Sequence, residues 1–269
     1  MAELIIDDST PNDVLFDPSH MRGGVPRDLT VDPPEMFADP SGIKLIPRSE
    51  WSARIREMKE QKSRLSDIRM TAGPNGGMIP SLDQNGQGFC WAYSVGSTIM
   101  AIRAVNNVPY VRISPHAVAC KIKGFRDEGG WCGLSAKFAR ETGYPSDKFW
   151  PQKSMSRSYD NAETWANAAL HKITEDWVDL SKPVYDQSLT FDMVMSCLLQ
   201  RIPCALDFYW WSHSVAGLDP EEVEPGSFGI RIWNSWTDGW SENGTAVLRG
   251  DKALPNGAVA TRGVPATAE

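Results

Sequence analysis

The chain has 269 residues, and its 27 lysines and arginines against 34 aspartates and glutamates give a formal net charge of -7 at pH 7. A hydrophobic fraction of 41% and a charged fraction of 23% are ordinary for a globular protein, which excludes wholesale disorder, collagen and coiled coil. The acidic pI near 5.2 argues against a nucleic-acid partner. No apolar run approaches the roughly 18 residues that a membrane-spanning helix needs, so we expect no membrane partner.

The N-terminal region carries neither a basic segment nor a long apolar stretch, so we expect no secretory signal and a location in the cytoplasm or in a virion. Without a signal, an odd and sparse set of cysteines favours reduced thiols over a disulfide framework. The cysteines are Cys90, Cys120, Cys132, Cys197 and Cys204. His116 lies one turn before Cys120, but these residues lack a paired C-x-x-C element, and we expect neither a metal nor a cofactor.

Residues 1–48 are polar and rich in proline, and their scattered apolar residues follow neither a helical nor a strand period. A segment of this composition cannot bury enough apolar surface to fold alone, so we predict an extended arm that is ordered only against another surface. A short charged helix is expected at 49–65. We therefore divide the chain into the arm with its short helix, residues 1–62, and a main domain, residues 63–269.

The clearest helix follows a glycine-rich loop. Apolar residues recur at i, i+4, i+8 and i+11 from Trp91 to Ile102, which predicts one buried helix from Cys90 to Val105. Further helices are predicted at 114–122, 135–141, 160–172 and 190–200. The first of these begins with serine followed by proline, and Asp160 with Glu163 resembles a capping box for the third.

After Pro203 the pattern changes to short strands separated by turn residues. The predicted strands are 204–210, 213–218, 228–233 and 244–249. The main domain is thus helical over about 83–200 and strand-forming over about 201–269. This segregation predicts an α+β fold with a helical subdomain, an antiparallel β subdomain and a cleft between them.

Cys90 is the first residue of the predicted central helix. The positive end of the helix dipole lowers the pKa of a thiol at this position and favours the thiolate, which is the nucleophilic form. Such a nucleophile needs a base, and the base needs a group that orients it. His213 begins a predicted strand and Asn234 follows the next one, and an asparagine oxygen can accept from an imidazole N–H. These three residues are therefore candidates for one catalytic site.

Four blocks of the sequence resemble the papain-like cysteine peptidase family. They are Asp83-Gln84 followed by Cys90-Trp91-Ala92-Tyr93-Ser94, then Gly129-Gly130, then His213-Ser214-Val215, then Asn234-Ser235-Trp236 with Gly239-Trp240. The blocks occur in the family's order of glutamine, cysteine, histidine and asparagine, and the resemblance covers about 82–250. It implies a papain-like fold whose β subdomain is barrel-like.

The resemblance also implies a role for each matching residue. Cys90 would be the nucleophile that attacks a peptide carbonyl, with His213 as the base and later the acid. Asn234 would orient His213, and Trp236 would cover that contact. The implied activity is hydrolysis of peptide bonds in a peptide or protein substrate through an acyl-enzyme on Cys90.

Three further residues would contact the substrate. Gln84 would supply an oxyanion-hole donor beside the backbone N–H of Cys90. Gly129 and Gly130 would expose a stretch of backbone that pairs with an extended peptide.

The chain departs from the family at several positions. Gln87 stands where the family usually has the first cysteine of its motif, so the family disulfide is absent. Phe89 places a large ring beside the nucleophile, where we expect it to narrow the cleft. The segment from Pro203 to His213 is shorter than usual, and no family propeptide is recognisable.

These departures leave other hypotheses open. One is a papain-fold structural or interaction protein of a larger assembly, for example a virion, with a residual or inactive site. The arm 1–48 would then be an anchoring strap to other subunits and not a cleaved propeptide. Another is acyl transfer by the same cysteine. The observation that separates them is whether the arm lies across the site of its own domain or extends away from it.

Overall fold

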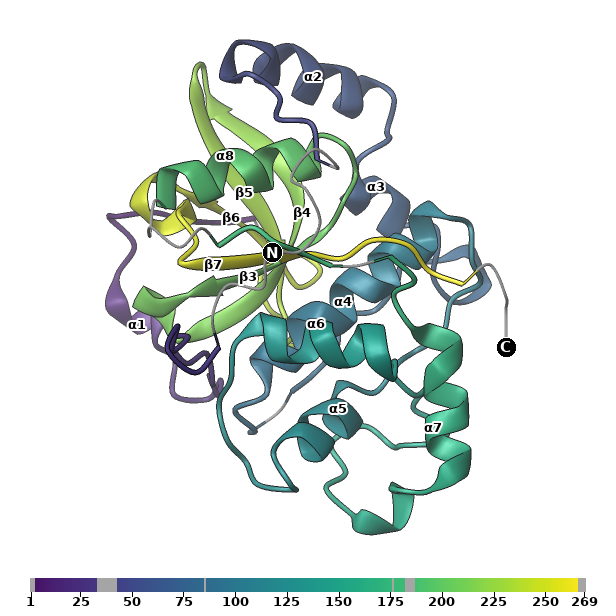
Figure 1. The fold of residues 1–269 in the computed structure, drawn as a ribbon. Coiled ribbons are helices and arrows are strands. Elements are labelled where there is room, and N and C mark those ends of the chain that lie inside the picture. Colours follow the sequence, from purple (N-terminus) through teal and green to yellow (C-terminus); the bar gives the residue numbers. More distant parts are fainter. Residues whose placement is uncertain (1–2, 33–42, 85, 176, 182–186, 266–269) are drawn as a thin grey trace.

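The structure, a computed structural model, describes residues 3–32, 43–84, 86–175, 177–181 and 187–265. Two groups of elements lie side by side in it, one helical and one built on a sheet (Figure 1). The chain already enters the sheet group with the strand Val178–Asp179, and not after residue 200 as the sequence predicts, because the helix Gln187–Leu198 packs on the sheet.

The helical half is centred on α4 (Cys90–Val105), which is buried along almost its whole length. It packs against strand β4 (His213–Glu224) of the sheet and against the helices α5 and α6 of its own half. The helices of this half are α4, α5 (Pro115–Ile122), α6 (Cys132–Glu141) and α7 (Ala162–Ala168). The start of α4 therefore lies at the junction between the two halves.

The sheet has seven strands in the order β1-β6-β5-β4-β3-β7-β2 within the described residues. The strands are β1 (Leu4–Ile6), β2 (Val178–Asp179), β3 (Cys204–Phe208), β4, β5 (Ser227–Trp233), β6 (Thr245–Arg249) and β7 (Gly257–Ala260). β1 runs parallel to β6, whereas the other described pairs are antiparallel. The remaining helices are α1 (Asn12–Leu15), α2 (Arg48–Glu60), α3 (Leu65–Arg69) and α8 (Gln187–Leu198).

Most of the predicted elements are present, and the clearest pattern gave the most accurate bounds. The predicted central helix is confirmed from Cys90 to Val105, and α5 begins after Ser114 as expected. The capping box at Asp160 is wrong. Asn161 caps α7 through a bond from the Thr164 N–H to its Oδ1 (3.0 Å), while Asp160 pairs with Lys121 at 2.9 Å.

The described part of the N-terminal arm lies on its own domain. β1 places residues 4–6 opposite residues 246–248 of β6, and Ile6 and Leu15 are buried in the core. This differs from the extended strap to other subunits that the composition suggested. The physical reason is local: three consecutive apolar residues at the start of the arm are enough to add one strand to an open sheet edge.

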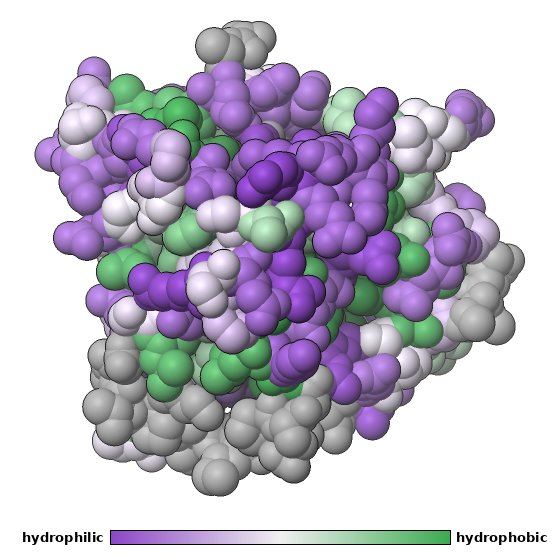
Figure 2. Space-filling model, turned by 90° about the horizontal axis from the view of Figure 1, so that it is seen from above, coloured by the Kyte–Doolittle hydropathy of each residue, from purple (hydrophilic) through white to green (hydrophobic). Residues whose placement is uncertain are grey.

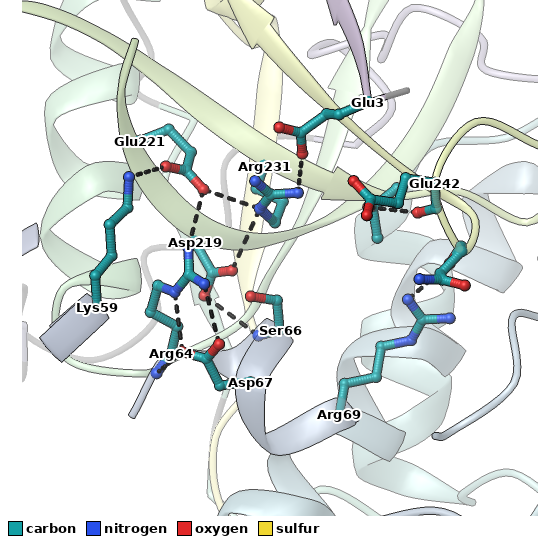
Figure 3. A network of polar contacts seen from close by, with 12 residues as sticks. Glu3, Lys59, Arg64, Ser66, Asp67, Arg69, Asp219, Glu221, Arg231 and Glu242 are labelled. Atoms are coloured by element: carbon teal, nitrogen blue, oxygen red, sulfur yellow. Dashed lines mark hydrogen bonds and ion pairs between the residues drawn. The ribbon is translucent and has the colours of Figure 1, made fainter. Parts of the chain in front are cut away.

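An ion-pair network joins α2, α3, the sheet and the start of the chain (Figure 3). Arg231 of β5 lies at its centre, with a 14% exposed side chain, and donates to Glu221 at 2.9 Å and to Glu3. Asp219 is fully buried and lies 3.8 Å from Arg231. Two further cations pair with Glu221, Lys59 at 2.6 Å and Arg64 at 3.3 Å.

Replacing Arg231 with methionine is expected to lower the free energy of unfolding by about 3 kcal/mol at pH 7, because it removes the cation that the buried carboxylates of Asp219 and Glu221 share. Burial already raises the pKa of Asp219 to about 6, so protonation at pH 5 should recover part of the loss. Urea denaturation at both pH values measures this. Arg54→Met, which removes an exposed pair with Glu50, is the control and should change little.

Figure 2 views the molecule from the side on which α2 lies. Hydrophilic residues dominate this face, and hydrophobic residues appear on it only in small groups. Of the helices in the described part of the chain, none combines the length and the apolar character of a membrane span.

Candidate active site

Cys90 begins α4, as the sequence predicts, and its side chain is fully buried. Its Sγ accepts a hydrogen bond from the backbone N–H of Gly23 at 3.3 Å. The backbone of Ser214, the residue after His213, also hydrogen-bonds the thiol. The first turn of α4 and the first residues of β4 therefore meet at the sulfur.

His213 is the first residue of β4, and Ser212 before it has a left-handed φ of 47° that turns the chain into the strand. The His213 Nε2 lies 2.8 Å from the Oδ1 of Asn234, so the predicted histidine–asparagine contact is confirmed. The Trp236 ring stacks on the His213 ring at a centroid distance of 4.5 Å and shields the contact from water. Among the residues that the structure describes, Nδ1 has no hydrogen-bond partner, so this ring atom is available to bind a proton.

Gln84 is fully buried in the same site and points a donor into it. Its Oε1 accepts from the hydroxyl of Ser235 at 2.6 Å, which fixes the amide orientation. Its Nε2 donates to the carbonyl of Met21 at 3.0 Å and to that of Gln87 at 2.9 Å. Besides the neighbouring Gln87 carbonyl, this amide therefore holds a carbonyl of the arm, as an oxyanion-hole donor would hold a substrate carbonyl.

Gly130 pairs with the arm by two backbone hydrogen bonds. Its N–H donates to the carbonyl of Gly23, and its carbonyl accepts from the N–H of Val25, both at 2.9 Å. Gly129 lies beside them, where a Cβ would be 2.4 Å from Val25. The glycine pair thus presents backbone to an extended segment, and that segment is the chain's own arm.

Residues 20–27 of the arm run across the whole site. His20 stacks on Trp236 at a centroid distance of 4.6 Å. Gly24 donates to the carbonyl of Ser212 at 2.9 Å, next to His213. Residues 20–27 therefore cover the candidate catalytic residues from the Trp236 side to the Gly130 side, and they contain no helix.

The arm is not held as a substrate would be. Hydrolysis needs one carbonyl whose carbon faces the thiol at roughly 3–3.5 Å while its oxygen meets the oxyanion donors. Here the Cys90 thiol meets the N–H of Gly23, and the carbonyl on Gln84 belongs to Met21, two residues away. The segment therefore covers the site in a geometry that does not expose it to cleavage.

Burial keeps the Cys90 thiol and the His213 imidazole neutral. It raises the pKa of the Cys90 thiol to about 11, although hydrogen bonds from Ser214 and Gly23 oppose the shift. It also lowers the pKa of His213 to about 3, against the effect of its bond to Asn234. At pH 7 the covered site therefore holds a thiol and a neutral imidazole rather than a thiolate and an imidazolium.

The lowered pKa of His213 makes the stability of the covered form depend on pH. The pKa of His213 is 6.5 in the unfolded chain and about 3 in the native state. At pH values between these two, the unfolded chain binds a proton that the native state does not, so the free energy of unfolding decreases as the pH falls. At pH 4.5 this residue should cost roughly 2 kcal/mol relative to pH 7. Urea denaturation should show a smaller pH difference for His213→Gln than for the wild type.

Phe89 does not narrow the site, contrary to expectation. Its ring is fully buried and meets His116 edge-on at 5.1 Å. His116 in turn hydrogen-bonds the hydroxyl of Tyr93 at 2.5 Å and the side chain of Gln87 at 3.2 Å. The aromatic ring beside the nucleophile thus belongs to the helical core, because His116 offers it a partner behind α4.

The cysteines other than Cys90 are also buried as free thiols. Cys132 donates to the buried carboxylate of Asp207 at 3.1 Å and lies 3.2 Å from the hydroxyl of Ser94. Within the part of the chain that the structure describes, no group of three or more potential metal ligands is found.

Two sets of residues at the site were not predicted from the sequence. One is the arm segment around Gly23 and Gly24, whose only sequence signal is a pair of adjacent glycines in an otherwise polar stretch. The other is Asp207, which holds Ser214 beside Cys90 through a 2.5 Å bond from the serine hydroxyl. A single aspartate inside a predicted strand gives no such signal.

Solved structures of cysteine proteases are similar to this chain. Xylellain, from Xylella fastidiosa, has a TM-score of 0.58 at 17% identity, over 91% of this chain and 96% of that one. Procathepsin L2 from the larval midgut of Tenebrio molitor has a TM-score of 0.55 at 18% identity, over 74% of this chain and 67% of that one. The chain has a papain-like fold.

A third similar structure comes from work on the mite allergens Blo t 1 and Der p 1, with a TM-score of 0.51 at 14% identity over 80% of this chain and 91% of that one. No protein-family model matches the sequence, and the comparison with curated proteins gave no match. The α+β papain-like fold expected from the sequence is thus confirmed by structural similarity at low sequence identity.

Proposed function

We propose that this chain is a papain-like cysteine peptidase that hydrolyses peptide bonds through a thiolate of Cys90, and that its own arm keeps it latent. The observation that carries the proposal is the His213–Asn234 contact of 2.8 Å beneath Trp236, at the start of a strand that also hydrogen-bonds the Cys90 thiol. Structures named as cysteine proteases share the fold.

The chemistry follows from the groups present. With the arm displaced, water enters, the burial that holds the Cys90 thiol and His213 neutral is relieved, and His213 Nδ1 can take the thiol proton. The thiolate attacks a substrate carbonyl whose oxygen accepts from Gln84 Nε2 and the backbone N–H of Cys90. His213 then protonates the leaving amine, and water releases the acyl group from Cys90.

The site-directed test is labelling with an epoxide that traps papain-type thiolates. We expect one adduct on Cys90 in a variant whose arm is displaced, Gly23→Ala, and a much slower reaction in the wild type. Cys90→Ala should give no adduct. Labelling of several cysteines at equal rates, or none on Cys90 after arm displacement, would contradict the proposal.

The alternative of an assembly protein with a residual site has no supporting observation. The arm lies over its own domain's site across the described residues, and the three similar structures are named as proteases or allergens. The geometry around Cys90 therefore supports catalysis better than a structural role.

A further inference from the structure

Arg27, at the end of the arm segment that covers the site, is buried instead of solvated. Its side chain is 4% exposed, and its guanidinium donates to the carboxylate of Asp179 at 2.6 Å. The Asp179 side chain is 1% exposed and comes from β2 of the main domain. A long basic side chain is thus inserted into the protein and meets a carboxylate at its end.

Two aromatic residues lie beside Arg27. The guanidinium lies over the ring of Trp131 at 3.9 Å from its centroid, a cation–π arrangement. The hydroxyl of Tyr209 accepts from the backbone N–H of Arg27 at 3.0 Å. A flat aromatic face and a carboxylate together match the two binding features of a guanidinium group, which stacks and forms directed hydrogen bonds.

This position is continuous with the catalytic site. Trp131 directly follows Gly130, whose backbone exchanges hydrogen bonds with Gly23 and Val25 of the arm. Gly23 is the residue that meets the Cys90 thiol. The arm therefore brings the Arg27 side chain to Trp131 and Asp179 four residues after Gly23, and an extended peptide that follows the same path can place a side chain there.

The Asp179 carboxylate belongs to the main domain and would remain in place if the arm were displaced. Arg27 and its second partner, the carbonyl of Asp32 at 2.8 Å from the Arg27 Nε, both belong to the arm. Asp179 is fixed to the domain, where the N–H of Ser181 donates to its Oδ1 at 3.0 Å. Displacement of the arm would leave the Asp179 carboxylate and the Trp131 ring without their cation, so that another cation can take its place.

We propose that Asp179 and Trp131 form a substrate subsite that accepts an arginine side chain, and that Arg27 occupies it in the latent form. The proposal rests on the proposed peptidase function and names its substrate class: peptides with arginine close to the scissile bond, on the Gly130 side of Cys90. Lysine should bind less well, because an ammonium cannot stack on the indole as a planar guanidinium does.

The first experiment tests the subsite without relying on catalysis. In full-length Arg27→Ala, ethylguanidinium should raise the Tm in a concentration-dependent manner, because it fills the vacated position in the native state only. Ethylurea, which is neutral and of similar shape, should not. The wild type should not respond, since Arg27 fills the site, and neither should Arg27→Ala/Asp179→Asn. An equal response to both compounds, or no response of Arg27→Ala to ethylguanidinium, overturns the subsite.

The second experiment measures selectivity. In Gly23→Ala/Arg27→Ala, kcat/KM is compared for peptides that carry arginine or its neutral isostere citrulline at each position on either side of the scissile bond. We expect a preference for arginine of at least about tenfold at one position, and its loss in the added Asp179→Asn variant. Equal cleavage of both peptides at every position overturns the substrate assignment while keeping the peptidase function.

The two experiments separate the two proposals. If no peptide is cleaved but ethylguanidinium still stabilises Arg27→Ala, the peptidase function fails and the guanidinium-binding position stands. Circular dichroism of the Asp179→Asn variants checks that they are folded. Trp131→Leu offers an independent variant, in which the stacking surface is lost but the carboxylate remains, and the ethylguanidinium response should weaken.

Discussion

Replacing Gly23 with alanine is expected to raise both the peptidase activity and the alkylation rate of Cys90 in the full-length protein by at least about tenfold. A Cβ on Gly23 would lie 1.9 Å from the carbonyl oxygen of Gly88, which is backbone and cannot move aside as a side chain would. The arm can then no longer keep its bonds to Cys90 and Gly130. Iodoacetamide labelling followed by mass spectrometry, together with hydrolysis of a fluorogenic peptide, measures the two effects.

The matched control is Gly77→Ala, in a loop where the nearest atom to the new Cβ is the Pro74 carbonyl oxygen at 3.3 Å. It should leave both rates at the wild-type level. If Gly23→Ala keeps the wild-type alkylation rate while remaining folded, the arm does not limit access to Cys90. If alkylation rises without any peptide hydrolysis, the arm covers a site that does not turn over.

The second large effect is expected for His213→Gln, which should lower kcat by about 10²–10⁴-fold when measured in the Gly23→Ala background. Glutamine can still hydrogen-bond Asn234, but it offers no basic nitrogen in place of Nδ1. The Cys90 thiol would then remain protonated at pH 7, so its alkylation rate should also fall and should recover as the pH is raised toward the pKa of an isolated thiol.

The control for this variant is His116→Gln. His116 lies behind α4, bound to Tyr93 and Gln87, and does not contact the thiol. The His116→Gln substitution should change the stability of the protein more than it changes kcat. A His213→Gln enzyme that keeps its activity would show that another group takes the thiol proton, and the role given to His213 would have to be abandoned.

The fold was predictable where a long pattern or several separate motifs specify it. In the helix from Cys90 to Val105 the apolar face repeats over about three turns, from Trp91 to Ile102, and the predicted start at Cys90 is confirmed. His213 and Asn234 were recognised because each begins or follows a strand with a distinctive local sequence, and their contact is present at 2.8 Å. The strands β4, β5 and β6 were also expected, although β4 continues to Glu224.

The rest depends on tertiary contacts that leave little local trace. β1, β2 and β7 have at most four residues each, and their pairing partners lie far away in the chain. Phe89 is expected near the nucleophile from its position alone, and only the presence of His116 decides that it packs behind α4. The path of the arm depends on close backbone contacts of Gly23, which composition cannot reveal.

The segment over the site is attached to the domain on both sides. Before it, β1 is hydrogen-bonded to β6 and Ile6 is buried; after it, Ile43 and Ile46 are buried in the core. Since both ends are held, the covering segment competes with a substrate as an intramolecular ligand, whose effective concentration is in the millimolar range for short tethers. Dilution of the protein cannot release the covering segment. After a single cleavage within the segment, both pieces would still be attached to the domain. The activity of the proposed peptidase would therefore depend on the equilibrium between the arm covering the site and the arm displaced from it. A substrate that binds tightly would shift this equilibrium toward the displaced form.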